Sequence, residues 1–497
     1  MLKIYDTMAR EKRPFVPVHE GKIGMYVCGP TVYNYIHIGN ARTFISFDTI
    51  RRYLMWRGFD VTFVQNITDV DDKIIAKAAE EGRSAAEVAQ EYGQAFIDDM
   101  RAAGVMDPDV RPRATGEITE MIALVQKLID EGHAYAVEGD VYFAVRSYDK
   151  YGQLSNRNVD EMESGHRELR ADGQGLEDRK RDPLDFALWK AAKPGEPSWE
   201  SPWGQGRPGW HIECSAMSEK YLHLPFDIHG GGADLAFPHH ENERAQSEAA
   251  CGCTFANYWM HGGMLQINHE KMSKSLGNFL LLRDILKTTD ARVLRMLMLQ
   301  THYRSPLDFS DERLQESQAA LQRLTNFAKN TAWACDNAVD EPTGFDAAAY
   351  QAALDALRTA FIEAMDDDFN TAGALGAVFS FVGEANTLLG DGCVCRGDAE
   401  AVRAGAEAVV ELVGVLGIDL NAVDEAGASS SEVIALAASM AEYAGSDEDE
   451  AIQALLDRRA AARKERDFAL ADGVRDRLSA LGFVVEDTPQ GARVSRS

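Results

Sequence analysis

The strongest constraint on the fold is a strand, a turn and a helix that follow one another near the start of the chain. Residues 22–28 are mostly apolar and indicate a buried strand, and a second strand-like run lies at 60–66. Between them, residues 40–57 place apolar side chains at nearly helical spacing. A strand–helix–strand unit of this kind is typical of parallel sheets. The sequence therefore predicts an α/β fold with a Rossmann-type, doubly wound parallel sheet.

Two short runs, far apart, carry groups that suit a nucleotide. His37-Ile38-Gly39-Asn40 opens the helix after a Gly29-Pro30 turn, where such folds present backbone N–H groups and a helix dipole to phosphate. Lys271-Met272-Ser273-Lys274-Ser275 offers two lysines that could close over a triphosphate and balance charge developing at the α-phosphorus. Taken alone, the first run could be an ordinary capped helix start and the second a solvated basic loop.

Size and charge narrow the class of protein. A chain of 497 residues should hold three domains at roughly one per 150 residues. Its formal net charge of −28 argues against unspecific nucleic-acid binding, which depends on phosphate neutralisation. No apolar run approaches the ~20 residues that cross a bilayer, and the N-terminus lacks the apolar core of a secretory signal. We therefore expect a cytoplasmic protein with no membrane partner.

The seven scattered cysteines fit a reducing compartment better than a disulfide framework. The pairs Cys251/Cys253 and Cys393/Cys395 have one residue between them, which is not a common zinc spacing, so we expect plain thiols there.

Four other side chains indicate a metal centre. Cys28 ends the first strand and Cys214 lies on a later predicted helix. His239 and Glu243 stand four residues apart, so they project from one face of a helix. Two thiolates, one imidazole and one carboxylate make a plausible tetrahedral set for Zn²⁺. Scattered Cys and His residues are usually just buried, but a metal at Cys28 would face the same cleft as the phosphate-ready turn.

A glycine-rich run, His229 to Asp234, follows a predicted strand near 226–228. Such a turn would let the backbone approach a nucleotide, with Asp234 accepting hydrogen bonds from ribose hydroxyls; the alternative is a tight turn with a solvated aspartate. Trp210 could floor an amino-acid pocket or be merely structural.

The second half of the chain is predicted to be largely helical. Residues 348–417 are rich in Ala and Leu and suggest a helix bundle. Residues 424–450 are rich in Ser, Ala and acidic residues and indicate a linker or a weakly ordered excursion. Two segments are candidates for RNA contacts. They are residues 366–377 and the terminal cluster of Arg459, Arg463, Lys464 and Arg466 beside Phe468. A charge run of that kind is otherwise usually a solvated helix face.

The two signature-like runs, in this order, resemble the paired signatures of class I aminoacyl-tRNA synthetases. Further motifs make the chain resemble the cysteinyl-tRNA synthetase family over nearly its whole length, apart from residues 424–450. These motifs are Cys28-Gly29-Pro30-Thr31-Val32-Tyr33, His37-Ile38-Gly39-Asn40-Ala41-Arg42, Gly209 to Met217 and Gly230 to Glu243. Asn40 stands where many class I signatures have a second histidine, a variant that also occurs in this family.

The resemblance implies a set of site residues. The catalytic residues would be His37, Asn40, Lys271 and Lys274. ATP would be bound by Thr31, His37, Gly39, Asn40, Gly230, Gly231, Asp234 and Lys274, and Trp210 would line the cysteine pocket. One Zn²⁺ per chain would be held by Cys28, Cys214, His239 and Glu243, and Mg²⁺ would come with ATP.

The resemblance also implies a domain order. It runs as a Rossmann catalytic domain (1–115 and 206–265) split by a connective insertion (116–205), a stem-contact region with the second signature (266–340), a helical anticodon-binding bundle (341–423), an acidic linker (424–450) and a small tRNA-binding module (451–497).

The implied activity is that of a monomeric cysteine–tRNA ligase acting on L-cysteine, ATP and tRNA(Cys). Cysteine would be activated to cysteinyl-adenylate and then transferred to the tRNA 3′ end. Serine differs from cysteine only by O for S, and a steric pocket rejects such a near-isostere poorly. Zinc–thiolate ligation could supply the discrimination, on the order of 10⁴, that otherwise calls for editing. We therefore expect no editing domain.

Three other functions stay open on the sequence alone. A ligase passing the same adenylate to an amino-sugar should lack the terminal module. A non-catalytic RNA-binding paralogue should have lost signature lysines or metal ligands. A different nucleotidyltransferase with the first signature is disfavoured by the length and the helical second half of the chain.

Overall fold

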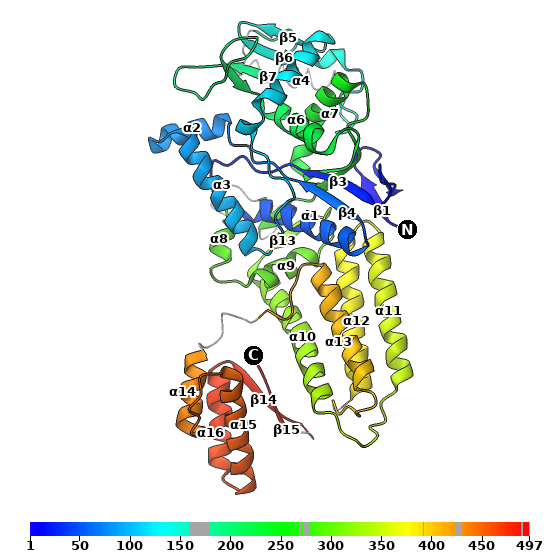
Figure 1. The fold of residues 1–497 in the computed structure, drawn as a ribbon, viewed down its shortest axis with the longest axis vertical. Coiled ribbons are helices and arrows are strands. Elements are labelled where there is room, and N and C mark those ends of the chain that lie inside the picture. Colours follow the sequence, from blue (N-terminus) through cyan, green and yellow to red (C-terminus); the bar gives the residue numbers. More distant parts are fainter. Residues whose placement is uncertain are drawn as a thin grey trace. The chain divides into compact units, whose positions relative to one another are not determined.

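The computed structural model of the chain is shown in Figure 1. It describes residues 1–159, 179–267, 270–271, 279–390, 392–422, 430–488 and 491–496. The chain forms two compact units. The first comprises Met1–Arg313, Ala364–Ala372 and Val415–Gly417, and the second comprises Leu314–Glu363, Gly373–Gly414 and Ile418–Ser497.

A four-stranded parallel sheet organises the first unit. Its strand order is β10-β9-β3-β4, with β3 at Lys22–Val27, β4 at Asp60–Val64, β9 at Phe226–Gly232 and β10 at Ala256–Gly262. All three strand pairs are parallel, and Met25 of β3 lies opposite Ile228 of β9. This sheet confirms the predicted Rossmann-type α/β fold and both predicted N-terminal strands.

Helix α1 (Ile38–Trp56) joins β3 to β4, close to the predicted 40–57. The apolar residues that predicted this helix, namely Phe44, Phe47, Ile50, Tyr53 and Leu54, are all buried. Near-continuous burial of β3 and β9 is what a parallel sheet covered on both faces requires.

A second, antiparallel sheet lies within the connection between β4 and β9. Its order is β5-β6-β7-β8, at Ala134–Val137, Asp140–Phe143, Phe186–Ala191 and Gly206–Pro208. Val141 and Phe143 lie in β6, which pairs antiparallel with both β5 and β7. A short 3-10 helix, Val145–Ser147, follows β6.

The remaining elements of the first unit connect or cover these sheets. They are β1 (Lys3–Asp6), β2 (Glu11–Pro14), α2 (Asp72–Glu81), α3 (Ala85–Ala102), η1 (Ala114–Gly116), α4 (Ile118–Asp130), α6 (Trp210–Leu222), η3 (Ala233–Ala236), α7 (His239–Cys251), β11 (Leu265–Ile267), β12 (Glu270–Lys271), α8 (Leu282–Ile285), α9 (Ala291–Leu299) and β13 (Leu307–Phe309). Val293 and Leu297 of α9 are part of the buried core.

Long helices dominate the second unit, as the sequence predicted. They are α10 (Asp311–Asp336), α11 (Ala347–Asp366), α12 (Thr371–Leu389) and α13 (Ala399–Val415). Within the described residues, α12 is the one helix long and apolar enough by composition to cross a membrane. The expectation that no apolar run reaches such a length is thus wrong for α12. Its Leu375, Val378 and Val382 are buried, as in the core helix of a bundle.

The end of the chain forms its own small core. Three helices, α14 (Ser430–Ala441), α15 (Glu448–Lys464) and α16 (Phe468–Ala480), precede the antiparallel hairpin of β14 (Phe483–Thr488) and β15 (Gly491–Arg496). Val433 and Ala437 of α14 are fully buried in this core. The interpretation of 424–450 as a linker is therefore wrong for residues 430–441, because the buried i, i+4 pair makes α14 a packed helix.

The cysteine expectation also needs a correction. Cys251 and Cys253 form a disulfide at the end of α7, where we expected two thiols. Cys393 and Cys395 are not joined in a disulfide, as expected.

Candidate active site and metal centre

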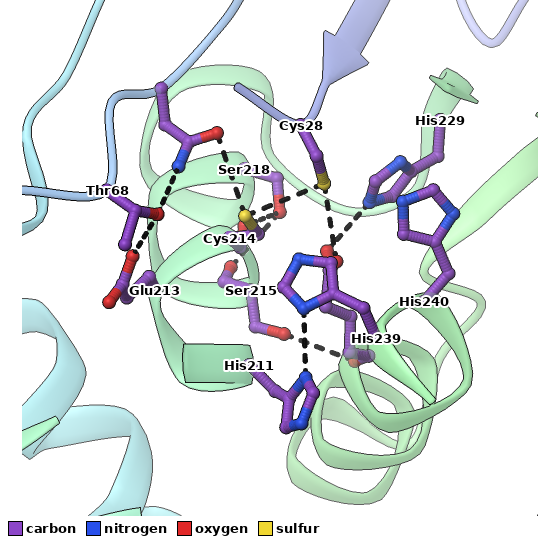
Figure 2. A network of polar contacts seen from close by, with 12 residues as sticks. Cys28, Thr68, His211, Glu213, Cys214, Ser215, Ser218, His229, His239 and His240 are labelled. Carbon is purple, nitrogen blue, oxygen red and sulfur yellow. Dashed lines mark hydrogen bonds and ion pairs between the residues drawn. The ribbon is translucent and has the colours of Figure 1, made fainter. Parts of the chain in front are cut away.

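Four potential metal ligands meet at the carboxyl end of the parallel sheet. Cys28 immediately follows β3, Cys214 lies in α6 and His239 begins α7 (Figure 2). Glu243 lies one turn after His239 in the same helix. The N–H of Cys28 donates to the carbonyl of Gly230 in β9, at 3.2 Å, so the neighbouring strand fixes the first ligand. Ligand sites in open α/β sheets occupy this end of the strands.

The ligand atoms are close enough to share one ion. The Cys28 and Cys214 sulfurs are 3.6 Å apart, and the Cys28 sulfur is 3.4 Å from Glu243 Oε1. His239 Nε2 is 2.9 Å from the same carboxylate oxygen. The four ligand atoms all lie within 4.8 Å of one another and all four residues are buried. A buried set of two sulfurs, one nitrogen and one oxygen fits Zn²⁺ by donor chemistry.

The electrostatics favour the ligating forms of some of these groups. Burial acts to raise the pKa of the Cys214 thiol, but contacts with Cys28 and His239 outweigh it and lower that pKa to about 6. Burial also opposes ionisation of Glu243, yet the charges of His229 and His239 hold its pKa well below the usual value. Burial together with the Cys214 contact raises the pKa of Cys28. The cluster is thus a concentration of charge that only mutual contacts stabilise.

Two further histidines orient the candidate ligands from outside. His211 Nδ1 lies 2.9 Å from His239 Nδ1, and His229 Nε2 lies 2.7 Å from Glu243 Oε2. Hydrogen bonds of this kind fix the tautomer and ring plane of a metal-binding side chain. A second possible ligand group, Cys28, His229, His240 and Glu243, shares two members with the first. The first group contains both thiols and therefore suits a soft ion better.

A polar network backs the turn after Cys28. The Gly29 N–H donates to Asn66 Oδ1 at 2.8 Å, Asn66 Nδ2 donates to Thr68 Oγ1 at 3.3 Å, and Thr68 donates to Glu213 at 2.7 Å. A Cβ at Gly29 would lie 1.7 Å from the Asn66 carbonyl oxygen, so only glycine fits there. Burial raises the pKa of Glu213 well above its usual value, against the hydrogen bond from Thr68, which lowers it.

The first signature caps α1 with its own side chains. The Asn40 N–H donates to His37 Nδ1 at 3.3 Å, and the His37 N–H donates to Asn40 Oδ1 at 3.4 Å. This reciprocal pair is a capping box, so the predicted alternative of an ordinary capped helix start describes the local structure correctly. It also leaves the positive end of the α1 dipole beside the cleft.

One cavity of about 380 Å³ joins the two sets of residues. Seven predicted site residues line it: Cys28, Thr31, His37, Gly39, Asn40, Trp210 and Asp234. Trp210 stacks on His239 with ring centroids 4.2 Å apart, which places the indole between the candidate metal site and the open cavity. One candidate metal ligand, Cys28, and the predicted phosphate-binding groups thus line the same cavity.

Gly230 and Gly231 are placed differently from the expectation of a glycine-rich turn, which is wrong here. Both lie within strand β9. A Cβ at Gly230 would lie 2.3 Å from the Phe47 ring, and one at Gly231 would lie 2.9 Å from His240 Cε1. Packing thus requires these two glycines, and their contact with ATP stays a prediction. Gly232, at the end of β9, lines the cavity.

The second signature falls mostly outside the described residues, and so does Lys274. The backbone of Lys271 pairs with Gln266 in the β11–β12 hairpin. Beyond the signature, the Ile38 N–H donates to the Leu280 carbonyl and the Leu282 N–H donates to the Ile36 carbonyl, both at 3.1 Å. The segment after the second signature is therefore tied to the start of the first.

Several residues of the site carried no recognisable signal in the sequence. Lys73 and Phe279 line the cavity, and the Phe279 ring contacts His37 with centroids 5.1 Å apart. Lys73 stands at the start of α2 after two aspartates, a context that is typical of a helix terminus. His211 and His229 lie within predicted motifs, but their spacing does not reveal which candidate ligand each one contacts.

The segments proposed for RNA contacts are only partly free to make them. Asp366 and Asp368 are buried, and the carboxylate of Asp366 pairs with Arg57 at 2.5 Å. Arg459 is also buried and makes a two-pronged ion pair with Asp487. Phosphate contacts from these positions are therefore not expected. Phe468, by contrast, is 60 % exposed and could stack on a base.

Three family models match the chain in series. The model described as "tRNA synthetases class I (C) catalytic domain" matches residues 14–319. A DALR domain model matches residues 360–421, and a model of the cysteinyl-tRNA ligase anticodon-binding domain matches residues 446–494. The last two ranges include helices of the second unit and the terminal core.

Curated relatives and solved structures agree with these matches. The chain is 48 % identical to a cysteine–tRNA ligase of Carboxydothermus hydrogenoformans, over 100 % of both chains. It is 49 % identical to one of Trichlorobacter lovleyi, over 99 % of this chain and 98 % of the relative. The fold resembles methionyl-tRNA synthetase of Mycobacterium tuberculosis with a TM-score of 0.59, at 18 % identity, covering 80 % of this chain and 90 % of that one.

Proposed function

This chain belongs to the cysteine–tRNA ligase family of class I aminoacyl-tRNA synthetases, and on that premise we propose how its cleft performs the reaction. We propose that it joins L-cysteine to ATP as cysteinyl-adenylate and then to the 3′ end of tRNA(Cys). The observation that carries the proposal is the cavity lined by Cys28 and Trp210 on one side and by His37 and Asn40 on the other.

In the first step a carboxylate oxygen of cysteine attacks the α-phosphorus of ATP. The bond from that phosphorus to the bridging oxygen breaks, and pyrophosphate leaves with the electron pair. The protein contributes position and charge rather than covalent chemistry. His37 and the start of α1 would hold the phosphates, and Lys271 and Lys274 would neutralise the leaving pyrophosphate together with Mg²⁺ that arrives with ATP. Asp234 would accept hydrogen bonds from the ribose.

In the second step a ribose hydroxyl at the tRNA 3′ end attacks the carbonyl carbon of the adenylate. The ester forms, AMP leaves, and the hydroxyl proton is lost to the phosphate or to solvent. No residue of the cleft needs to form a bond to the substrate in either step. The cleft instead holds the two reactants in line. Such positioning can raise a reaction rate by several orders of magnitude.

We propose that Cys28, Cys214, His239 and Glu243 hold one Zn²⁺. Bound there, zinc would supply a soft Lewis acid that prefers the thiolate of cysteine to the hydroxyl of serine. The chain keeps these ligands in place through His211 on His239 and His229 on Glu243. Trp210, stacked on His239, would exclude water and larger side chains from the same corner. With selection achieved at this point, no separate editing site is needed.

Recognition of tRNA would belong to the second unit. Residues 360–421 match the DALR model and residues 446–494 match the anticodon-binding model. We propose that the helical bundle (341–423) and the terminal module (451–497) bind tRNA. We also propose a cytoplasmic monomer. The terminal core disfavours the amino-sugar ligase, which should lack it.

A pyrophosphate-exchange assay with each of the twenty amino acids tests the function directly. Exchange of label from pyrophosphate into ATP should depend on cysteine and not on serine. The matched control is Cys335→Ser, because Cys335 is also a buried free thiol but lies in α10. It should leave exchange unchanged. Exchange driven equally by serine would contradict the proposed selection, and no exchange with any amino acid would contradict adenylate formation.

A further inference from the structure

Arg42 is a buried arginine of α1 whose four described hydrogen bonds all go to main-chain acceptors. The acceptors are the carbonyl oxygens of Gly263 at 2.9 Å, Met264 at 2.8 Å, His302 at 3.4 Å and Ser305. It lies half a turn after Asn40, so it is part of the same helix end as the first signature. The Arg42 side chain therefore links the start of α1 to main-chain groups of other segments.

The chemistry of this contact is specific to arginine. Burial lowers the pKa of Arg42 to about 10, so the guanidinium stays charged at neutral pH. A guanidinium presents five N–H donors in one rigid plane, whereas an ammonium presents three donors around a point. Each terminal nitrogen of Arg42 reaches two carbonyls, and the four carbonyls belong to two separate loops. Lysine cannot reproduce that geometry.

The two loops held by Arg42 are the base of the second signature. Gly263 and Met264 line the cavity and lead directly into β11, which pairs with β12 and its Lys271. Ser305 lies just before β13, which pairs with the other edge of β11 in a three-stranded sheet. Through these contacts the Arg42 side chain links α1 to the β11–β12–β13 sheet.

The loops are also packed tightly against each other beneath Arg42. A Cβ at Gly263 would lie 2.5 Å from the carbonyl oxygens of both Arg304 and Ser305. The loop of Arg304 is itself fixed from the far side, where Asp368 accepts hydrogen bonds from Arg304 at 2.7 Å and from Tyr303 at 2.8 Å. The base of the sheet is therefore tightly packed, and Arg42 binds it to α1 through four hydrogen bonds.

We propose that Arg42 is a positioning residue for cysteine activation, which sets the distance between the phosphate end of α1 and the hairpin that carries the second signature. This role rests on the proposed adenylate chemistry. The residues after the signature are tied to α1 by the Ile36 and Ile38 hydrogen bonds. Arg42 supplies the matching restraint before the signature. With either restraint loosened, the signature lysines would meet the triphosphate out of line.

Loss of the Arg42 contacts should lower the catalytic efficiency with ATP but leave the affinity for cysteine unchanged. A misplacement of about 1 Å in reacting groups can lower a rate on the order of 100-fold. The hydrogen bonds described for Arg42 reach none of the four candidate metal ligands, so the amino-acid end of the cavity should keep its affinity. Arg42→Lys should therefore lower kcat/KM for ATP in pyrophosphate exchange by roughly 10- to 100-fold. Its Kd for cysteine, measured by equilibrium dialysis of the zinc-loaded full-length enzyme, should change less than twofold.

The matched control is Arg295→Lys. Arg295 is equally buried, lies in α9 of the same unit and also donates to a main-chain carbonyl, that of Leu416 at 2.7 Å. Its other partners include Asp48 and Thr49, away from the 263–264 loop. It should lose a similar amount of thermal stability but keep kcat/KM for ATP within about threefold of the parent. A second test variant, Gly263→Ala, should reproduce the ATP defect by moving the same loop.

Several outcomes would overturn the role of Arg42. The first is a kcat/KM for ATP within threefold of the parent in both Arg42→Lys and Gly263→Ala. The second is a loss of kcat/KM for ATP in Arg295→Lys as large as in Arg42→Lys. The third is a loss of cysteine affinity in Arg42→Lys equal to its loss of kcat/KM for ATP. If Arg42→Lys does not fold, the Gly263→Ala result alone decides the question. A parent enzyme without cysteine-dependent exchange would instead overturn the proposed function, and the positioning role with it.

Discussion

Replacing Gly230 by alanine should damage the catalytic sheet more than the added methyl group suggests. The new Cβ would lie 2.3 Å and 2.4 Å from two carbons of the Phe47 ring, and ordinary carbon contacts are well over 1 Å longer. Phe47 is fully buried in α1, so its ring has no free space to enter. Overpacking of this kind costs about 1–3 kcal/mol, and we expect a value near the upper end. The carbonyl of Gly230 also accepts the hydrogen bond from the Cys28 N–H, so the candidate metal site should be disturbed as well.

The test is a double-mutant cycle read by thermal unfolding. Gly230→Ala should lower the melting temperature on the order of 5 °C, at a few degrees per kcal/mol. Phe47→Leu removes the clashing atoms, so the double variant should be more stable than the two single losses predict, by about 1–2 kcal/mol. Gly376→Ala is the control: Gly376 is exposed in α12 with open space around it, and alanine there should stabilise by about 0.5–1 kcal/mol. Equal effects of the two glycine substitutions, or strict additivity of Gly230→Ala and Phe47→Leu, would refute the packing argument.

Four further predictions concern the site and the terminal core. Cys214→Ser should lose bound zinc by elemental analysis and lose cysteine activation, while Cys335→Ser keeps both; zinc retained at full occupancy would remove Cys214 from the ligand set. Lys274→Ala should lower the rate of adenylate formation at least 10-fold with little change in cysteine affinity, since its charge is needed as pyrophosphate leaves; equal losses would contradict that role. Deleting residues 451–497 should weaken tRNA charging but spare pyrophosphate exchange, and unchanged charging would show that the module is dispensable. Asp487, whose arginine partners lower its pKa from 3.8 to about 2, should stabilise the terminal core above pH 4, and this contribution should be lost as the pH falls towards 2. Because Asp487 is about half exposed, solvent should screen its ion pairs, and their contribution to the free energy of unfolding should be much smaller than the pKa shift alone implies. Asp487→Asn should remove that acid-side loss in a urea titration, and an unchanged pH profile would contradict the ion pair's role.

The sequence predicted the central fold well because local and long-range signals agreed there. The stripe of Phe44, Phe47 and Ile50 marks α1 by period alone, and buried parallel strands leave apolar runs that need no partner to be recognised. The terminal part was harder. In α14, Val433 and Ala437 are buried, but serine, alanine and acidic neighbours gave the segment the composition of a linker.

The site was predictable as a set of residue types but not as a geometry. Motif order indicated Cys28, Cys214, His239 and Glu243, and the structure brings their ligand atoms together. Sequence spacing cannot reveal that His229 meets Glu243 across the sheet edge. The glycines of β9 misled the prediction. A run of three glycines is typical of a turn, but Gly230 lies in a strand, where close packing against Phe47 requires glycine.

The position of β3 in the sheet has a consequence for synthesis of the chain. β3 pairs with β4 within its own neighbourhood, but its other edge is completed by β9, which follows only after the whole antiparallel insertion. Such distant pairing is slow relative to local contacts. During synthesis, the Cys28 thiol therefore cannot contact the other three candidate ligands until α6, β9 and α7 have left the ribosome. A nascent chain cannot assemble this candidate metal site before roughly half of it exists, so an ion could be bound there only after α7 has been made.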